Sequence, residues 1–463
     1  MTFAIVVLAL VLLMLAAYRG YSVILVAPLA ALLAVLLTDP AAVPSVFTGL
    51  FMERMVGFLK LYFPVFLLGA VFGKLIELSG FSQSIAAAVI RLVGQERAIL
   101  SIVLVCALLT YGGVSLFVVV FAVYPFAAEM FRRGDIPKRL IPGTIALGAF
   151  TFTMDALPGT PQIQNIIPTT FFGTTTWAAP WLGVIGGIFI LTCGLLYLDW
   201  RRRQALGAGE GYGTSHNNEP QQLAAGNSIH PLLAVAPLLV VGVANLAFTR
   251  LIPRFYEPTI ETRLEGLAQP LVTQLSSVVA IWAVMGALLM GILTVVSFAF
   301  RPVASSFAEG TKSAVGGALL AAMNTASEYG FGAVIAALPG FVIIRNALLA
   351  IPDPLLNEAI TVTTLAGITG SASGGLSIAL AAMSEHFMTA AQAAGIAPEV
   401  LHRVAAMASG GMDTLPHNGA VITLLAVTGL THRQAYKDIF AITCVKTLAV
   451  FCVIGVYYAT GIV

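Results

Sequence analysis

The sequence predicts an all-α polytopic membrane protein built from two inverted-topology repeats, each with about five spans, a re-entrant hairpin and a broken helix. Three observations support this fold class: the composition, the succession of apolar segments, and a motif that occurs twice. Of the 463 residues, 59% are hydrophobic and 10% are charged, whereas roughly a quarter of the residues in a soluble domain are charged. A chain of this composition needs a bilayer around it.

Apolar segments follow one another along most of the chain, and a simple span needs about 20 residues. The N-terminal segment "TFAIVVLALVLLMLAAYRGY" has no basic region before it and no small-residue cleavage site after it, so we expect it to be the first span and not a signal peptide. Further apolar segments lie at residues 21–37, 59–80, 98–128, 140–199 with interruptions, 231–249, 271–299, 314–343, 357–394, 403–430 and 438–461.

One segment near the middle is different. Residues 201–228 are polar and rich in glycine, which is typical of a flexible surface linker. The segment divides the chain into a first repeat at 1–200, a cytoplasmic linker at 201–230 and a second repeat at 231–463.

Composition also excludes several functions. A net charge of +2, spread over short loops, gives no basic patch for nucleic acid. The four cysteines stand singly in apolar segments, which predicts neither a disulfide nor a metal site. The six histidines lack metal-ligand spacing and no serine has an obvious base, so we expect no enzyme and no cofactor.

The repeated motif is "TMDALPGTPQIQN" at 153–165 and "GMDTLPHNGAVIT" at 411–423. Its aspartates, Asp155 and Asp413, are 258 residues apart (413 − 155). Three more pairs follow in the same order at nearly the same spacing: Phe72 with Phe331, Gly112 with Gly374, and Pro137 with Pro398. Ordered matches at near-constant spacing indicate an internal duplication.

The charges of the loops predict how the repeats are oriented, because basic loops tend to be cytoplasmic. A single crossing by 98–128 would place the basic groups around Arg97 and Arg132 on opposite sides. We therefore expect a hairpin that enters and leaves on the cytoplasmic side, with its tip near "YGGVS". Five crossings per half then invert the second half, so that the matching hairpin, with its tip at "GSASGGLS", enters from outside.

Glycine and proline breaks at membrane depth are tolerated only where the freed backbone groups line a cavity or meet protein. Each break creates a half-helix whose N-terminus suits an anion, so the sequence predicts a carboxylate site. The candidate substrate-binding residues lie at the two tips and the two breaks: Gly113, Ser115, Gly159, Thr160, Gln162, Asn165, Ser371, Ser373, Gly374, His417 and Asn418. The serines could instead serve helix packing, the amides could bond to backbone, and the histidine could be structural.

Three intramembrane acids are candidates for ion coupling: Asp155, Asp413 and Glu328. An aspartate before a half-helix could equally cap its free N–H groups. Glu328 in "NTASEYG" could instead order the neighbouring helices.

Long motifs resemble the gluconate permease (GntP) family: "DALPGTPQIQNIIPTTFFGT", "NTASEYGFGAVIAALPGF", "GSASGGLSIAL" and "DTLPHNGAVITLLAVTGLTHRQAYKD". The likeness is greater to the D-3-hydroxybutyrate permease-like branch, because classical gluconate permeases carry a break resembling "PPTPGP" where this chain has "DALPGTPQ". The resemblance implies a dimeric secondary transporter of the ion-transporter superfamily in the bacterial inner membrane, which moves a small hydroxy-carboxylate with protons by an elevator motion.

If the hairpins and broken helices carry the substrate, residues 98–176 and 357–430 form the moving transport domain, and the remainder forms the scaffold against which it moves. No lysine or arginine lies within the two tips and two breaks, which favours a substrate with one carboxylate, such as 3-hydroxybutyrate. The alternatives are a proton symporter of gluconate or another sugar acid, and a sodium-coupled di- or tricarboxylate carrier of the same superfamily. An ion channel is disfavoured because the sequence has no repeated filter and no ring of acids.

Overall fold

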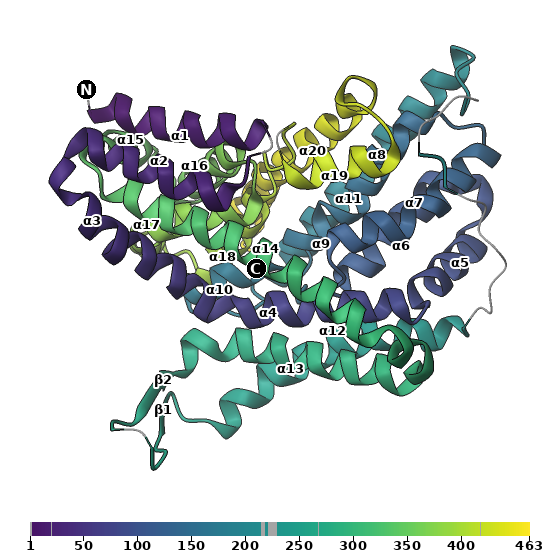
Figure 1. Ribbon diagram of the computed structural model, residues 1–463. Coiled ribbons are helices and arrows are strands. Elements are labelled where there is room, and N and C mark those ends of the chain that lie inside the picture. Colours follow the sequence, from purple (N-terminus) through teal and green to yellow (C-terminus); the bar gives the residue numbers. More distant parts are fainter. Residues whose placement is uncertain (1, 20, 214–217, 221–228, 267, 417) are drawn as a thin grey trace.

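The computed structural model describes the whole chain except residues 1, 20, 214–217, 221–228, 267 and 417. Helices dominate it (Figure 1). The helices of the first half are α1 Thr2–Tyr18, α2 Val23–Thr38, the short α3 Val43–Ser45, α4 Met52–Leu78, α5 Phe81–Val93, α6 Ala98–Tyr111, α7 Leu116–Arg133, α8 Ile141–Ala149, α9 Phe152–Asp155, α10 Ile163–Phe172 and α11 Pro180–Gly207.

The second half repeats the order of the first. Single helices come first, a pair of helices joined by a tight turn follows, and a segment in which the helix is interrupted precedes the last long helix. Its elements are α12 Pro231–Phe255, β1 Thr259–Thr262, β2 Leu271–Gln274, α13 Leu275–Phe298, α14 Phe300–Ala337, α15 Pro339–Leu349, α16 Pro354–Thr369, α17 Ala372–Ala393, α18 Pro398–Ser409, α19 Gly419–Thr428 and α20 His432–Thr460.

The expectation of an all-α chain is wrong at one place. Between α12 and α13 the strands β1 and β2 pair in antiparallel register, with Thr259 opposite Gln274, and the hairpin projects from the helical body (Figure 1). Its segments "TIET" and "LVTQ" are rich in β-branched residues, which favour strands. The surrounding sequence consists of long apolar helical segments, so the preference of these two four-residue segments for strands is easily overlooked.

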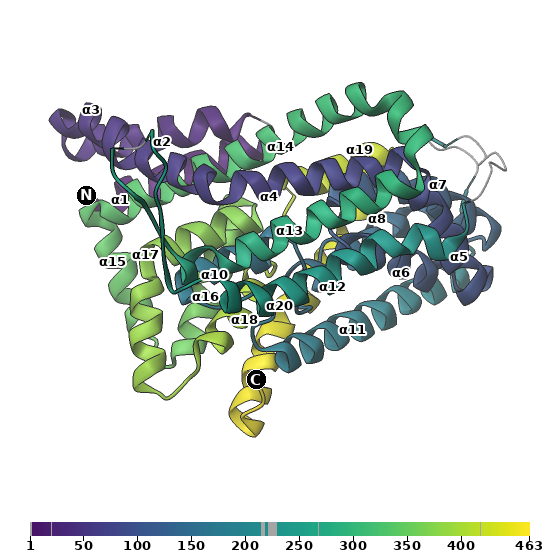
Figure 2. The same cartoon turned by 90° about the horizontal axis from the view of Figure 1, so that it is seen from below.

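Five helical segments of the described chain are long and apolar enough to cross a bilayer. They are Pro40–Leu78, Pro180–Gly207, Pro231–Phe255, Leu275–Phe298 and His432–Thr460. A sixth is present if α14 and α15, which meet at 79°, count as one bent span. Figure 2 shows α4, α13 and α12 running side by side. The chain is a multi-pass membrane protein.

Both segments predicted to form hairpins are pairs of packed helices. In the first, α6 and α7 are joined at residues 112–115, where Gly113 has a φ of +97°. In the second, α16 and α17 are joined at residues 370–371, where Gly370 has a φ of +64°. Glycine adopts positive φ without the steric cost that a Cβ brings, so both turns depend on it. We call these turns the first tip and the second tip.

The helices also stop at both copies of the repeated motif, as the glycine and proline residues predict. The first break, residues 156–162, separates α9 from α10, and Gly159 in it has a φ of +76°. The second break lies between Ser409 at the end of α18 and Gly419 at the start of α19.

Elements of the two halves pack on one another in exchanged pairs. Helix α2 packs along α14 while α13 packs along α4, and α1 packs on α15 while α12 packs on α5. In the centre, α10 packs against α17 and α19 against α7. Each half therefore places its post-break helix against the hairpin of the other half, which brings the breaks and hairpins into one packed body.

The described part of the predicted linker is attached to the helical body. Helix α11 continues to Gly207, beyond the predicted start of the linker. Arg139 forms a two-bonded ion pair with Glu210, at 2.6 and 2.7 Å, and Lys138 pairs with Glu219 at 2.8 Å. Hydrogen bonding from the Arg139 guanidinium holds the pKa of Glu210 below its ordinary value. These ion pairs hold the described part of the linker against the segment that follows the first hairpin.

A candidate functional site at the helix breaks and hairpin tips

The first break is held by hydrogen bonds from two asparagines. Asn165 donates to the carbonyl oxygens of Thr160 and Thr176, at 3.0 and 2.9 Å. Asn245 of α12 donates to the carbonyl of Gly159 at 2.9 Å, and the Thr160 hydroxyl donates to the Thr153 carbonyl at 2.7 Å. Buried backbone groups must find partners, and here side chains supply them. In this conformation the Asn165 amide therefore serves the backbone, one of the two roles that the sequence left open.

A buried arginine also holds the first break. Arg403 of α18 is fully buried and donates to the carbonyls of Ala178 and Asp155, at 2.7 and 2.9 Å, and to the Asn165 side chain at 3.1 Å. Its neighbour His402 lies 3.2 Å from the same Asn165 oxygen. The second half thus adds donors, from Asn245 and Arg403, that fix the break of the first half.

The second break contains a buried ion pair. Asp413 pairs with Lys446 of α20, and Lys446 also donates to the carbonyl of Phe150, at 3.1 Å, just before the first break. The lysine is 1% exposed and Asp413 8%. Lys446 therefore touches the segments around both breaks.

Asp155 completes this group. The charges of Lys446, Asp413 and Arg403 all act on its carboxyl, and its Oδ2 lies where a Cβ on Gly410 would overlap it. Its Oδ1 is buried without a hydrogen-bond partner in the described structure. We call Asp155, Arg403, Asp413 and Lys446 the break cluster. The two aspartates of the repeated motif, 258 residues apart in sequence (413 − 155), thus share one buried site.

Neither aspartate caps the half-helix that follows it. The N-cap of α10 is Gln162, whose side chain makes no capping bond. The N-cap of α19 is Asn418, whose side-chain oxygen accepts from the N–H groups of Ala420 and Val421, at 2.7 and 3.1 Å. In this structure, therefore, Asp155 and Asp413 do not act as helix caps.

Each break is tied to the nearby hairpin of its own half by a side-chain amide. Gln162 donates to the carbonyl of Thr110, beside the first tip, at 2.7 Å. Asn418 donates to the carbonyl of Gly370, in the second tip, at 2.7 Å. These matching bonds join the candidate residues of tip and break into one unit in each half.

The first tip is closely covered by apolar side chains. A Cβ on Gly112 would overlap Leu238 of α12, and one on Gly113 would lie 3.1 Å from Pro161 and 3.4 Å from Leu288 of α13. The backbone N of Ser115 lies against Gly73 of α4. In this conformation the candidates Gly113 and Ser115 therefore lie at a contact with α4, α12 and α13.

The second tip gathers polar groups around a buried acid. The Ser371 hydroxyl accepts from the N–H of Gly374 at 3.1 Å, and Ser373 and Thr325 share a hydrogen bond of 3.2 Å. Glu328 of α14 is 3% exposed, and its Oε2 has no hydrogen-bond partner in the described structure. We call these five residues, Thr325, Glu328, Ser371, Ser373 and Gly374, the tip cluster.

The candidate His417 lies outside the described residues.

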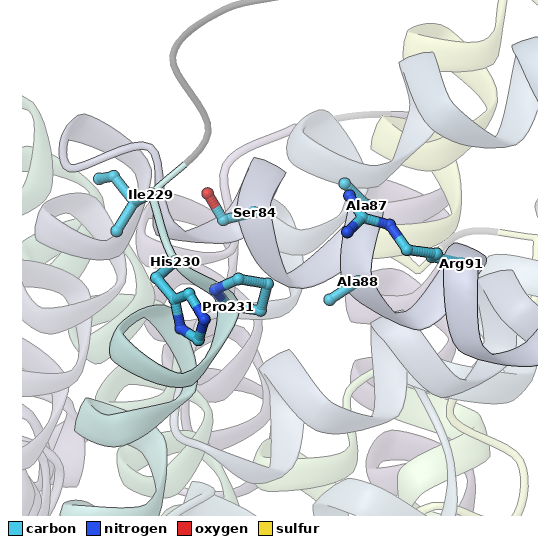
Figure 3. A pocket seen from close by; sticks show the side chains of 7 residues that line it. All are labelled: Ser84, Ala87, Ala88, Arg91, Ile229, His230 and Pro231. Carbon is cyan, nitrogen blue, oxygen red and sulfur yellow. The ribbon is translucent and has the colours of Figure 1, made fainter.

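An open pocket of about 380 Å³ lies between α5 and the start of α12, lined by Arg91, His230 and Ser84 with their neighbours (Figure 3). None of its lining residues belongs to a tip or a break, so it is not part of the candidate site.

Comparison with known proteins identifies the class. No family model matches the chain. The uncharacterized transporter YxjC of Bacillus subtilis (strain 168) is 58% identical over 472 aligned positions, which cover all of both chains. This chain belongs to the same transporter family as YxjC. The crystal structure of the Alcanivorax borkumensis YdaH transporter, which has an unusual topology, matches this transporter with a TM-score of 0.52 at 16% identity. That match covers 90% of this chain and 88% of the other, and it concerns the fold alone.

The structure corrects one step in the sequence argument about the transporter's site. The tips and breaks themselves contain no lysine or arginine, but Arg403 and Lys446 reach them from α18 and α20. Both are single basic residues inside apolar helical segments, "VLHRVAAM" and "TCVKTLAV". A basic residue in such a position is expensive unless it is paired, and that signal could have identified them. No group of three metal-binding side chains occurs among the residues that the structure describes.

Proposed function

We propose that this transporter is a symporter that couples a small hydroxy-monocarboxylate, with 3-hydroxybutyrate as the first candidate, to protons. The break cluster is the observation that carries this proposal. Ionisable groups inside a membrane are costly and mark substrate and ion pathways. Secondary transporters bind their substrates near the midplane, at interrupted helices. Four ionisable side chains buried where two helix breaks meet satisfy both descriptions.

Charge balance supports one proton for each substrate anion. Two acids and two bases make the break cluster formally neutral, so a bound monocarboxylate adds one uncompensated negative charge. An anion moving inward also opposes a membrane potential worth roughly 2.3 kcal/mol per 100 mV. One proton on Asp155, Asp413 or Glu328 offsets both effects.

The same balance limits the size of the substrate. Arg403 and Lys446 are balanced in number by Asp155 and Asp413, so the site has no surplus positive charge for a second or third carboxylate. Citrate should therefore bind poorly. The motif resemblance to the D-3-hydroxybutyrate permease-like branch supports a short hydroxy acid.

The exchanged packing of the two halves supports an inverted-repeat architecture. In this proposal residues 98–176 and 357–430 form a moving transport domain, because their hairpins and post-break helices pack across the two halves. The long helices at 2–37 and 231–299 form a scaffold that also makes a homodimer. Inward- and outward-facing structures superposed on the scaffold should show both hairpins displaced together. Hairpins that stay fixed while an outer gate swings would contradict the elevator.

The function is tested by uptake into proteoliposomes. Labelled 3-hydroxybutyrate, gluconate, lactate and citrate are each supplied with and without an inward pH gradient or sodium gradient. We expect saturable accumulation of 3-hydroxybutyrate that needs the pH gradient and disappears with a protonophore. Accumulation driven by a sodium gradient alone would show that the coupling ion is sodium and not the proton. Strong inhibition of uptake by citrate but not by 3-hydroxybutyrate would show that the substrate is not a short monocarboxylate.

The inverted topology has a separate test. In a functional cysteine-free background, single cysteines replace Gly134 and Ala397, which lie in loops, and Gln204, which is exposed in the last turns of α11. A membrane-impermeant thiol reagent should label positions 134 and 204 from the cytoplasm and position 397 from outside. Labelling of 134 and 397 from the same face would contradict the inverted arrangement.

A further inference from the structure

The carboxyl of Glu328 lies against the first turn of α17. A Cβ added to Gly374, which is in that turn, would overlap the Glu328 Oε2 atom. The side chain comes from α14, which packs along α17. The absence of a side chain at Gly374 is therefore what admits the carboxyl to this end of the helix.

A helix N-terminus attracts an anion, because its first N–H groups have no partners within the helix and its dipole is positive there. The second tip is such an N-terminus, and the sequence predicts that it binds the substrate carboxylate. Glu328 already places the protein's own carboxyl there, with one oxygen buried and unpartnered. Two ionised carboxylates at one helix end repel each other, so the tip accommodates only one of them in ionised form.

Among the residues that the structure describes, no positive charge acts on Glu328. Helices α2, α4, α13, α15 and α17 and the segment Val46–Phe51 pack on α14. Among their described side chains, the Ser371 hydroxyl interacts with this carboxyl and no charged group acts on it. Arg54 of α4 acts on Tyr329, the residue that follows Glu328 in α14. Asp413, in contrast, has Lys446 as a direct partner.

The first half has no equivalent acid. Phe72 and Phe331 are matched positions in the two repeats, and the residue three places before each is Gly69 in the first half and Glu328 in the second. An acid at a hairpin tip is thus a property of the second half alone. Duplication alone would give both tips the same residue, so the presence of the acid in one tip indicates a function that only the second tip has.

We propose that Glu328 and the substrate carboxylate compete for the N-terminus of α17, so that the transporter binds its substrate only when Glu328 is protonated. The inference rests on the proposed function and specifies the acid that carries the coupled proton. With Glu328 ionised, its own charge occupies the tip and repels the anion. With Glu328 neutral, the tip accepts the substrate carboxylate, and anion and proton are carried together.

The test is calorimetric titration of the purified full-length protein with 3-hydroxybutyrate over a series of pH values, in pairs of buffers with different ionisation enthalpies. In the pH range where Glu328 is ionised, the wild type should take up about one proton per substrate, and its affinity should fall about tenfold per unit of pH. Glu328→Gln should bind without proton uptake and with an affinity that does not change across that range. Glu309→Gln, which changes an exposed acid on the same helix, should behave as the wild type.

The outcomes separate the two proposals. Binding by the wild type without proton uptake, or an unchanged pH slope in Glu328→Gln, would overturn this inference and leave the proposed function standing. Failure of the wild type to bind 3-hydroxybutyrate, gluconate or lactate at any pH would overturn both. If Glu328→Gln does not fold, the wild-type proton count still decides, together with infrared difference spectra. Substrate binding should then produce the carbonyl band of a protonated carboxylic acid, and no such band would reject the proposal.

Discussion

The break cluster and the tip cluster are both buried and both lie where helices are interrupted, but they differ in charge balance. The break cluster holds two acids and two bases, and Lys446 pairs directly with Asp413. The tip cluster holds one acid and three hydroxyl side chains, from Thr325, Ser371 and Ser373. A paired buried charge can remain ionised, whereas an unpaired one tends to become neutral. The comparison sets a direct ion pair of Asp413 with Lys446 at the breaks against an acid without a charged partner, among the described residues, at the tip.

The largest expected effect is the loss of one partner in the break cluster. Asp413→Asn leaves Lys446 buried without its acid, and removing one member of a buried ion pair costs about 3–5 kcal/mol. Thermal unfolding in detergent measures this as a large fall in stability. The surface control Asp199→Asn, which breaks exposed pairs with Arg202 and Arg203, should cost about 0–1 kcal/mol.

The double variant Asp413→Leu with Lys446→Met sharpens this result. Replacing both members of a buried pair with apolar residues is often nearly neutral, so the double variant should recover most of the stability lost in Asp413→Asn. If the double variant is as unstable as the single one, the two side chains do not form a balanced pair.

Arg403→Met should cost about 3 kcal/mol, because it removes a charged donor from two buried carbonyls and from Asn165. The loss should appear as earlier unfolding and as faster proteolysis near the first break. Arg433→Met, at an exposed arginine of α20, should stay within about 0.5 kcal/mol of the wild type. Equal effects of the two substitutions would mean that Arg403 does not hold the break.

Two glycine substitutions compare the clusters directly. Gly374→Ala and Gly410→Ala each place a methyl against a buried acid, Glu328 and Asp155 respectively, and overpacking of this kind costs about 1–3 kcal/mol. Adding Glu328→Ala should rescue Gly374→Ala, because that acid has no charged partner to lose. Adding Asp155→Ala should not rescue Gly410→Ala, because Lys446 and Arg403 would lose a balancing charge. If thermal unfolding shows rescue in both cases, the two clusters do not differ in charge balance as proposed.

The smallest expected effect is that of Glu328→Gln on stability. Glutamine is close in shape to a neutral glutamic acid, so the variant should unfold within about 0.5 kcal/mol of the wild type at acidic pH. At alkaline pH it should be the more stable of the two, because the wild type must then either bury a charge or expose it. A variant that is much less stable than the wild type at all pH values would indicate that the charge itself holds the tip.

Several features of this fold could be predicted from the sequence because they depend on neighbours along the chain. Glycine and proline disfavour a helix most where they are clustered, as in the repeated motif, so the breaks before Ile163 and Gly419 follow from it, whereas single prolines such as Pro64 and Pro125 lie inside helices. The turns of both hairpins likewise follow from glycine at positions 113 and 370. The β-hairpin between α12 and α13 was missed, because four-residue strands give a weak local signal beside long apolar helices.

The sequence by itself determined a membrane-spanning helical chain, two interrupted segments, two hairpins and the acids at positions 155, 328 and 413. Only the tertiary structure decided which of these acids has a cationic partner. Asp413 meets a lysine 33 residues further along the chain, Arg403 reaches the carbonyl of Asp155 across 248 residues, and Glu328 meets a helix end instead of a base. The physical reason is that a buried charge is compensated by whatever neighbouring helices place beside it, and packing between the two halves sets that neighbour.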